Sequence, residues 1–337
     1  MLLSPPFSPT APEYGATPLQ PIKARILAAL SLDARATFSD IANRLGLSRQ
    51  QVKYHFDQLE EQQIIESCYA ILDVVRLGYL YHRVLIRLAD LPPERKHSTI
   101  EYFARHPRVG WLVEYEGAWD VALAIWTRSM SEFELALDEM LSNVGRDVAD
   151  KLISFSAKTF HLKNKFLTRE RDERALLVGG DVPEVALDEL DYAILGVLTK
   201  NARRSYREIG LALSVSPKVV KYRMQRMLDA GVILGFDVKL NHQMLGFTHH
   251  KIFLKLANIS SENVDSVIEH LLALTNTTCI TKSIGFSDLE FEIMVRNSGE
   301  LDGTLQGIRE AFPDLIREAS SLIVSQETYV NYLPWKK

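Results

Sequence analysis

The sequence predicts an α+β chain made of two repeats, each a winged helix-turn-helix unit followed by a ferredoxin-like βαββαβ domain. The first observation is a match of the chain with itself at a shift of 168 residues, which places residues 25–88 on residues 193–256 without a gap. The second is the order of elements: helices and a hairpin, then alternating strands and helices, twice over. Such a self-match decides the architecture, so we expect two copies of one module of roughly 150 residues.

Individual motifs carry the same period. Two of them return after 168 residues: Ser48-x-x-x-Val52-Lys53-Tyr54 as Ser216-x-x-x-Val220-Lys221-Tyr222, and Gly117-x-x-Asp120 as Gly285-x-x-Asp288. Whatever one module does as a pair, this chain can do alone, so we expect an internal pseudo-dimer.

The composition excludes several protein classes. The 337 residues are 47% hydrophobic and 24% charged, and no apolar run reaches the length of a membrane span. The net charge of −4 argues against a uniformly basic coat, so any nucleic-acid binding must come from a local patch. Cys68 and Cys279 fall at different places in the repeat and form neither a disulfide framework nor a metal pattern, which favours a reducing cytoplasm.

The chain begins with a segment that differs from the repeats. Residues 1–21 contain six prolines and no Lys or Arg, which is typical of a flexible arm and lacks the positive start of a signal peptide.

Each module opens with three predicted helices. In the first copy residues 22–32 and 38–45 are apolar on one face, Ser48 is a good N-cap, and Val52, Phe56 and Leu59 give the third helix one apolar face. Residues 64–72 are expected to form a β-hairpin, which completes a winged helix-turn-helix. These patterns place the two units at residues 22–76 and 188–244.

A different pattern of apolar and polar residues follows each winged helix-turn-helix unit. Residues 84–87 alternate as in a strand, residues 92–106 form an amphipathic helix that begins with a proline, and two strands flank Gly117. A second helix at 131–141 and a strand at 152–160 complete the βαββαβ order. The ferredoxin-like domains are thus expected at residues 77–162 and 245–337, with a charged, glycine-containing linker at 163–187.

The third helix of each unit is the candidate DNA reader. A turn of 100° per residue directs Gln50, Lys53 and Tyr54 outward in the first copy, where the face has no net charge. The second copy has a face of charge +3 and further basic residues before it, and its candidate DNA-binding residues are Lys218, Lys221, Tyr222, Gln225, Arg226, Arg203, Arg204 and Arg207. Basic residues contact phosphates and Arg, Lys and Gln read base edges, although such a set also suits a solvated helix face.

The turn between the middle strands is a second candidate site. It carries Gly117 and Asp120 in the first copy and Gly285 and Asp288 in the second. A plain hairpin explains the glycines, and it does not require an aspartate at the same place in both copies. The repeated aspartate makes these four residues a candidate binding site.

Catalytic and metal motifs are missing from the sequence. It has no phosphate-cradling loop, no Cys-x-x-Cys and no nucleophile elbow, so we expect no catalytic residues, no cofactor, no metal and no enzymatic activity. His249 and His250 are adjacent on a predicted strand, so they point to opposite faces and cannot chelate one ion together.

Several residues resemble the leucine-responsive/AsnC family of transcription regulators. The resemblance rests on residues 187–191, Ile194-Leu195, Ala202-Arg203, Glu208-Ile209, Ser216, residues 231–233, Leu245-Gly246 and the Gly285-x-x-Asp288 turn. The first copy departs from the pattern, since residues 61–65 have no glycine and Leu19-Gln20-Pro21 replaces the acidic start.

The resemblance implies a function. In this family the ferredoxin-like domains pair through their sheets, the winged helices bind double-stranded DNA, and a small effector, often an amino acid, binds near the pairing and the Gly-x-x-Asp turn. Pairing within one chain would free the two DNA readers to diverge. Members also assemble into larger rings, which implies further homo-oligomers.

Two alternatives stay open. Decarboxylases of a haem precursor resemble these regulators in fold, but they carry a histidine-containing stretch on the second strand of the domain, and residues 110–114 and 278–282 have no histidine. An effector sensor or scaffold without DNA binding is the other alternative, which the neutral first helix face allows and the basic second one argues against.

Overall fold

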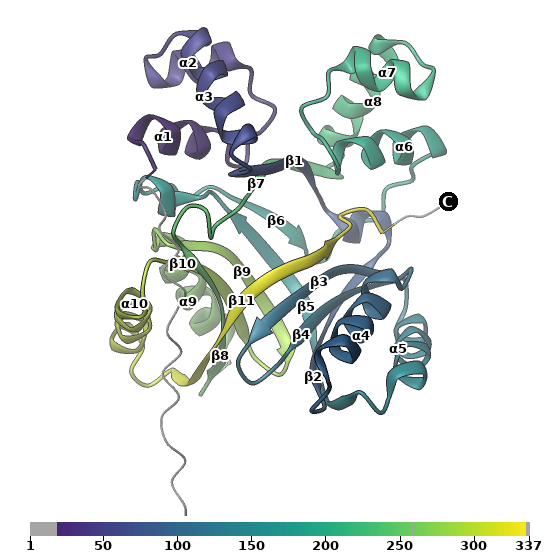
Figure 1. The fold of residues 1–337 in the computed structure, drawn as a ribbon, viewed down its shortest axis with the longest axis vertical. Helices are drawn as coiled ribbons and strands as arrows, with labels where there is room; N and C mark the ends of the chain where they lie inside the picture. The colour runs from purple at the N-terminus through teal and green to yellow at the C-terminus, as the bar shows by residue number, and fades with distance from the viewer. Residues whose placement is uncertain (1–18, 258, 335–337) are drawn as a thin grey trace, which may run out of the picture.

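The computed structural model describes residues 19–257 and 259–334, and most of the expected arm, residues 1–18, lies outside them. Two helical units stand side by side above one large β-structure (Figure 1). We call residues 19–72 the first head, residues 188–240 the second head, and the β-structure with its helices the body.

Each head contains the three predicted helices. Thr37 and Ser48 form capping boxes with Asp40 and Gln51, which explains why the second and third helices of the first head begin where they do. Ser205 caps the corresponding helix of the second head in the same way. The helices are α1 (Pro21–Leu30), α2 (Phe38–Leu45) and α3 (Arg49–Glu61), then α6 (Glu189–Leu198), α7 (Tyr206–Leu213) and α8 (Pro217–Asp229).

The prediction of a β-hairpin after the third helix of each head is wrong. Each head contributes one strand, β1 (Ile65–Leu72) or β7 (Ile233–Leu240), and these two strands pair antiparallel with each other. An isolated two-stranded hairpin in each head would have been marginal, whereas one ribbon shared between the heads buries Cys68, Ala70 and Val238.

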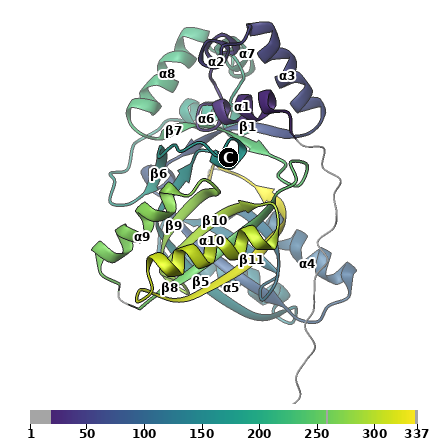
Figure 2. The ribbon, with the colours of Figure 1, turned by 90° about the vertical axis from the view of Figure 1, so that its left-hand side faces the viewer.

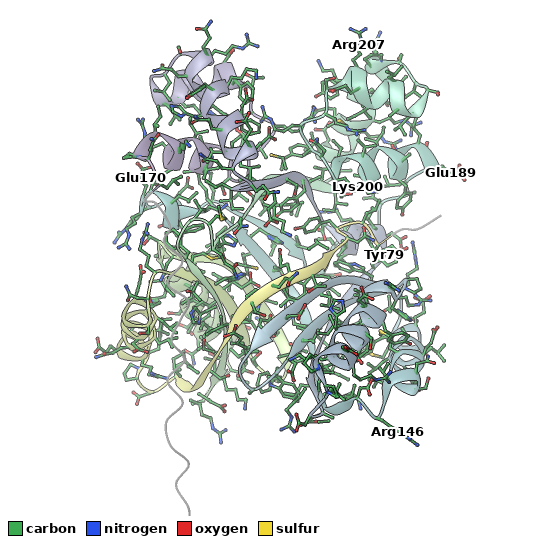
Figure 3. The ribbon with its side chains drawn as sticks, viewed as in Figure 1. Tyr79, Arg146, Glu170, Glu189, Lys200 and Arg207 are labelled. Atoms are coloured by element: carbon green, nitrogen blue, oxygen red, sulfur yellow. The ribbon has the colours of Figure 1, made fainter. Side chains whose placement is uncertain are left out.

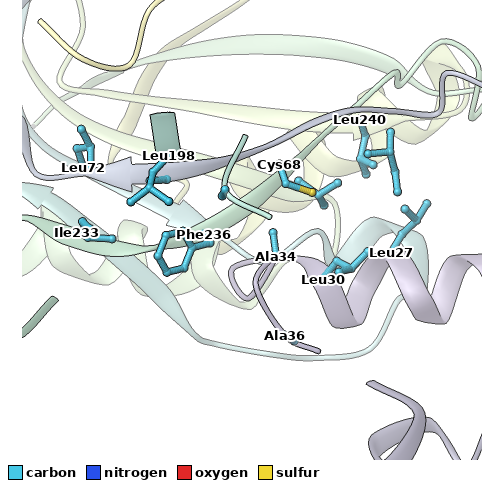
Figure 4. Close-up of a cluster of buried hydrophobic side chains, with 14 of the residues drawn as sticks. Leu27, Leu30, Ala34, Ala36, Cys68, Leu72, Leu198, Ile233, Phe236 and Leu240 are labelled. Carbon is cyan, nitrogen blue, oxygen red and sulfur yellow. The ribbon is translucent and has the colours of Figure 1, made fainter. Parts of the chain in front are cut away.

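The ribbon joins the heads into one core. Buried side chains from α1, α6 and both ribbon strands pack together, as Figure 4 shows for Leu30, Leu198 and Phe236. The two heads are therefore held at one relative position, with α3 and α8 on opposite sides in Figure 2.

The body has the predicted βαββαβ order twice. The first copy comprises β2 (Leu80–Leu88), α4 (Pro93–Arg105), β3 (Val109–Glu116), β4 (Val121–Thr127), α5 (Met130–Val144) and β5 (Val148–Leu162). The second comprises β8 (Thr248–Leu256), α9 (Ser261–Ala273), β9 (Thr277–Gly285), β10 (Leu289–Val295), α10 (Ser298–Ala311) and β11 (Ile316–Val330).

The two sheets close into a barrel. Within each copy the strand order is β5-β2-β4-β3 or β11-β8-β10-β9, and the pairs β3–β11 and β5–β9 join the copies at both edges. Closure leaves no unpaired edge between the two sheets. Alternate residues of each strand therefore face either the helices or the barrel interior.

The expected linker is more ordered than its composition suggests. It contains a short 3-10 helix, η2 (Lys165–Leu167), and a strand, β6 (Ala175–Gly179), which pairs with β5 beyond the barrel. A second short helix, η1 (Val74–Leu77), connects the ribbon to β2. Within residues 19–257 and 259–334 no helix combines the length and apolarity that crossing a bilayer requires.

Candidate functional site

Helix α8 presents a basic, exposed face. Ser216 caps it and Pro217 occupies its first turn, while Val220, Met224 and Met227 are buried in the head. This packing leaves the other side of the helix in solvent, where Tyr222 is 66% exposed. Lys218 and Lys221 are exposed on the same side, with no ion-pair partner among the described residues.

Arg226 differs from this group. It pairs with Asp191 at the start of α6, a carboxylate with no exposed surface, and Arg223 binds the same carboxylate at 3.2 Å. Arg223 also pairs with Asp188, the N-cap of α6. These bonds fix α8 against α6. Arg226 thus positions the helix while part of its side chain stays exposed, and its contact with DNA stays a prediction.

The corresponding face of α3 is occupied by contacts within the helix. Lys53 pairs with Asp57 one turn later, and Gln58 donates to the Tyr54 hydroxyl at 2.8 Å. Gln50 is exposed near the start of the helix. In α8 the positions of Asp57 and Gln58 are taken by Gln225 and Arg226. Lys221 and Tyr222 therefore lack the partners within the helix that Lys53 and Tyr54 have. Gln225 itself donates to Asp229 at 2.8 Å.

Arg203 lies between the heads and does not face solvent with the other basic residues. Its guanidinium donates to the carbonyls of Ala34 and Ala36 at 2.6 and 3.2 Å and lies 4.6 Å from the ring centre of Phe38. Its equivalent in the first head, Arg35, donates in the same way to the carbonyls of Ala202 and Arg204. Both arginines thus join the heads, and DNA binding by Arg203 stays a prediction that these contacts disfavour.

The remaining basic candidates are dispersed. Arg204 and Arg207 are exposed. Figure 3 shows Arg207 at the end of the second head farthest from the body, whereas Lys200 lies on the side near the body. The net positive charge of the helices of the second head is thus concentrated on α8, since Arg207 of α7 is followed by Glu208.

The two Gly-x-x-Asp turns have a structural function. Asp120 accepts a hydrogen bond from the backbone N–H of Leu88 at 2.9 Å and from Lys96 at 2.8 Å, and Asp288 accepts one from the N–H of Leu256 at 2.7 Å. The glycines Gly117 and Gly285 have φ of 135° and 121°, which other residues rarely adopt. None of the four residues lines the cavity described next, and their assignment to an effector site stays a prediction.

A cavity of about 1140 Å³ lies where the barrel meets the ribbon. Its body side comes from the upper ends of the barrel strands, including Arg83, Trp111 and Glu292. Its head side comes from ribbon residues such as Tyr69 and Lys239, so the cavity contacts both the body and the element that carries the heads.

A buried charge network reaches the cavity through two of its members, Arg83 and Glu292, and continues behind the lining. Arg83 and Lys251, which are equivalent in the two copies, both pair with Glu290, and Lys251 also pairs with Glu292 at 3.1 Å. Ser154 donates to Glu290 at 2.8 Å. Burial alone would raise the pKa of Glu292, but the charge of Lys251 and the hydrogen bond from His249 hold it well below its ordinary value.

Histidines surround the cavity. Burial lowers the pKa of His161, and it lowers the pKa of His242 to about 3, so both imidazoles are neutral at neutral pH. His249 faces Glu292, whereas His250 points to the other side of the strand, where it contacts Ser321 at 3.2 Å. Among the described residues no group of three or more His, Cys, Asp or Glu side chains is arranged to hold a metal ion.

Sequence reasoning did not find this cavity or its charges. The signal was available in the repeat, because Glu290 and Glu292 stand at interior strand positions where the first copy has Ala122 and Ala124. Closed sheets direct these positions inward, but only the pairing of the two copies shows that the acids meet Arg83 and Lys251.

Comparisons with known proteins place these features in a family. A model of the AsnC-type helix-turn-helix domain matches residues 187–228, and a model of winged helix-turn-helix DNA-binding domains matches residues 19–66. An uncharacterised HTH-type transcriptional regulator of Pyrococcus horikoshii is 30% identical over 123 residues, which are 36% of this chain and 81% of that protein. Regulatory protein AsnC of Haemophilus influenzae is 28% identical over 140 residues, 42% of this chain and 92% of its own length.

A solved structure matches nearly the whole chain. The siroheme decarboxylase NirDL superposes with a TM-score of 0.63 at 12% identity and covers 94% of both chains, and its complex with an iron-uroporphyrin III analogue gives 0.62 over the same shares. At this identity the likeness concerns the fold. The expectation that this chain is not an enzyme is nevertheless overturned, because an enzyme has the same two-module architecture.

Both heads thus match DNA-binding helix-turn-helix models, and the regulators match single modules of the repeat. The chain belongs to the leucine-responsive/AsnC family of helix-turn-helix transcriptional regulators, with two family modules in tandem.

Proposed function

We propose that this chain is a sequence-specific DNA-binding regulator of transcription that acts in the cytoplasm as an internal pseudo-dimer, and that its second head supplies most of the DNA affinity. The observation that carries the proposal is the difference between the two third helices. Lys218, Lys221 and Tyr222 are exposed without partners among the described residues, whereas Lys53 and Tyr54 are bonded within their own helix. Unpaired cations are the ones available to contact phosphates and displace the counterions condensed on DNA.

Binding of a small effector is the second part of the proposal. Family regulators respond to such molecules near their paired sheets, and here the cavity next to the ribbon offers room for one. Association of several chains, as in the rings of other family members, belongs to the same proposal.

A fluorescence-anisotropy titration of the full chain tests DNA recognition. The probes are the DNA upstream of its own gene and a random duplex of equal length, each at two salt concentrations. The proposal predicts salt-sensitive binding with preference for the upstream DNA. Failure to bind either duplex at low salt contradicts it and favours a sensor or scaffold without DNA binding.

Decarboxylation of a haem-precursor tetrapyrrole is the second candidate function. The cavity favours it because its volume suits a large ligand and because His161, His242 and His249 line it, although the strands where the related enzymes carry histidine have none. Incubation with an iron tetrapyrrole carrying carboxylate side chains tests it: a changed absorbance spectrum together with released carbon dioxide supports an enzyme, and an unchanged spectrum removes the candidate.

A further inference from the structure

Duplication has made the two sides of the central cavity different. Residues 168 positions apart occupy equivalent places on the barrel strands, and a pair of identical modules would give two identical sides. Here three equivalent pairs in the lining differ in chemistry: Tyr81 and His249, Trp111 and Cys279, Trp126 and Met294. The cavity is therefore suited to one asymmetric ligand and not to two symmetric ones.

The first module supplies an aromatic side. The rings of Tyr81 and Trp126 are 4.9 Å apart, and the guanidinium of Arg83 lies 6.0 Å from the ring centre of Trp111. Gly110 makes room for this arrangement, because a Cβ there would lie 1.5 Å from Trp126 Nε1. Aromatic surfaces of this kind favour offset stacking with another flat ring.

The second module supplies a polar side. His249, Thr281 and Glu292 line it, with Cys279 between strands β5 and β10. Glu292 is bonded to Lys251 and His249, so its charge is balanced within the protein. A bound molecule is therefore not required to be a cation.

Several hydrogen-bond donors on residues that line the cavity have no acceptor within the described part of the protein. Arg83 Nε, Trp126 Nε1 and Ser156 Oγ are buried and have no hydrogen-bond partner among the described residues. Buried donors without partners are rare because they lose their hydration. Trp126 Nε1 lies against Gly110, so the contents of the cavity are expected to accept from Arg83 and Ser156.

From these contacts we infer that the cavity binds one planar aromatic ligand per chain. The ring lies against Tyr81, Trp111 and Trp126, and acceptor atoms of the ligand, such as a ring nitrogen, a carbonyl or a carboxylate, face Arg83 and Ser156. The inference rests on the proposed control by an effector and specifies the chemistry of that effector.

The position of the cavity also links ligand binding to the heads. Tyr69 of the ribbon lines the cavity and stacks on Tyr332 at a ring distance of 4.2 Å, and Lys239 of the other ribbon strand pairs with Glu327 of β11 at 3.1 Å. A ligand held between barrel and ribbon fixes the element that carries both heads. DNA and ligand then change each other's affinity by the same factor.

Binding calorimetry on the full chain tests the inference with two planar aromatic acids of different size. They distinguish a small heteroaromatic ligand from a tetrapyrrole. Indole-3-acetate represents small heteroaromatic acids, and haemin represents tetrapyrroles. At least one probe is expected to bind with a stoichiometry of one per chain. Trp126→Leu and Ser156→Val are each expected to weaken that binding at least tenfold, and Tyr102→Leu, on α4 outside the lining, serves as the control.

Binding of neither probe, a stoichiometry of two, or unchanged affinity in both Trp126→Leu and Ser156→Val would overturn the inference. Circular dichroism of each variant verifies folding. If Trp126→Leu fails to fold, Ser156→Val still tests the inference, because it replaces one hydroxyl by a methyl group and adds one methyl group. DNA binding is measured on the same preparations. If the unmodified chain binds DNA but neither probe, this inference alone is refuted. If it binds a probe but not DNA, the proposed regulator alone is refuted.

Discussion

Replacement of Arg203 by alanine separates a structural arginine from a DNA-binding one. Arg203 makes two charged hydrogen bonds to the carbonyls of Ala34 and Ala36 and lies over the rings of Phe38 and Phe56. Such hydrogen bonds contribute about 1.5–3 kcal/mol each. A cation over an aromatic ring contributes about 0.5–2 kcal/mol. The lower ends of these ranges add to about 4 kcal/mol, a large fraction of the stability of a typical domain.

Scanning calorimetry and a DNA titration give the two necessary readouts. Arg203→Ala is expected to lower the unfolding midpoint of the heads strongly, while the folded protein keeps the salt dependence of DNA binding. Arg207→Ala, an exposed arginine four residues later, is the matched control and is expected to change stability by less than about 0.5 kcal/mol and to lower the salt slope by about one. An unchanged midpoint together with a lower salt slope in Arg203→Ala would refute the reasoning, because it would place Arg203 on the DNA.

Three further substitutions test individual contacts. Burial lowers the pKa of His82 to about 4, so as the pH falls this histidine is protonated first in the unfolded chain. The folded protein therefore loses stability between pH 6.5 and pH 4. His82→Met is expected to remove roughly 3 kcal/mol of that loss, measured by urea titrations at the two pH values. Asp191→Asn removes the charge that holds Arg223 and Arg226 and is expected to cost about 3 kcal/mol by thermal unfolding, whereas an unchanged midpoint would show that the pairs contribute nothing. Asp288→Ala is expected to cost about 1–3 kcal/mol because the N–H of Leu256 loses its acceptor, and weaker ligand binding at unchanged stability would instead support the effector-site prediction.

The repeat made most of the fold predictable. Gly117 and Gly285, Ser48 and Ser216, and the helix faces around Val52 and Val220 all recur at one spacing, so each element was supported twice. The same local patterns could not show that β1 pairs with β7, because a strand of eight residues satisfies its hydrogen bonds equally in a hairpin or with another module.

The site was less predictable for a related reason. Arg203 and Arg207 look alike in the sequence, and only the packing of one head on the other shows that Arg203 reaches the carbonyls of residues 34 and 36. The exposed positions of Lys218 and Lys221 follow from helical periodicity alone, so they were placed correctly on the surface. For Arg203 the deciding contacts cross from one head to the other, and periodicity within one module does not contain them.

The most direct test of the central claim compares the two third helices by anisotropy titration of full-length variants on the upstream DNA. Lys218→Ala/Lys221→Ala is expected to weaken binding more than Gln50→Ala/Lys53→Ala and to lower the salt slope by about two, since each lysine accounts for about one released counterion. Greater loss of affinity in the Gln50→Ala/Lys53→Ala variant would contradict the claim that the second head dominates DNA binding.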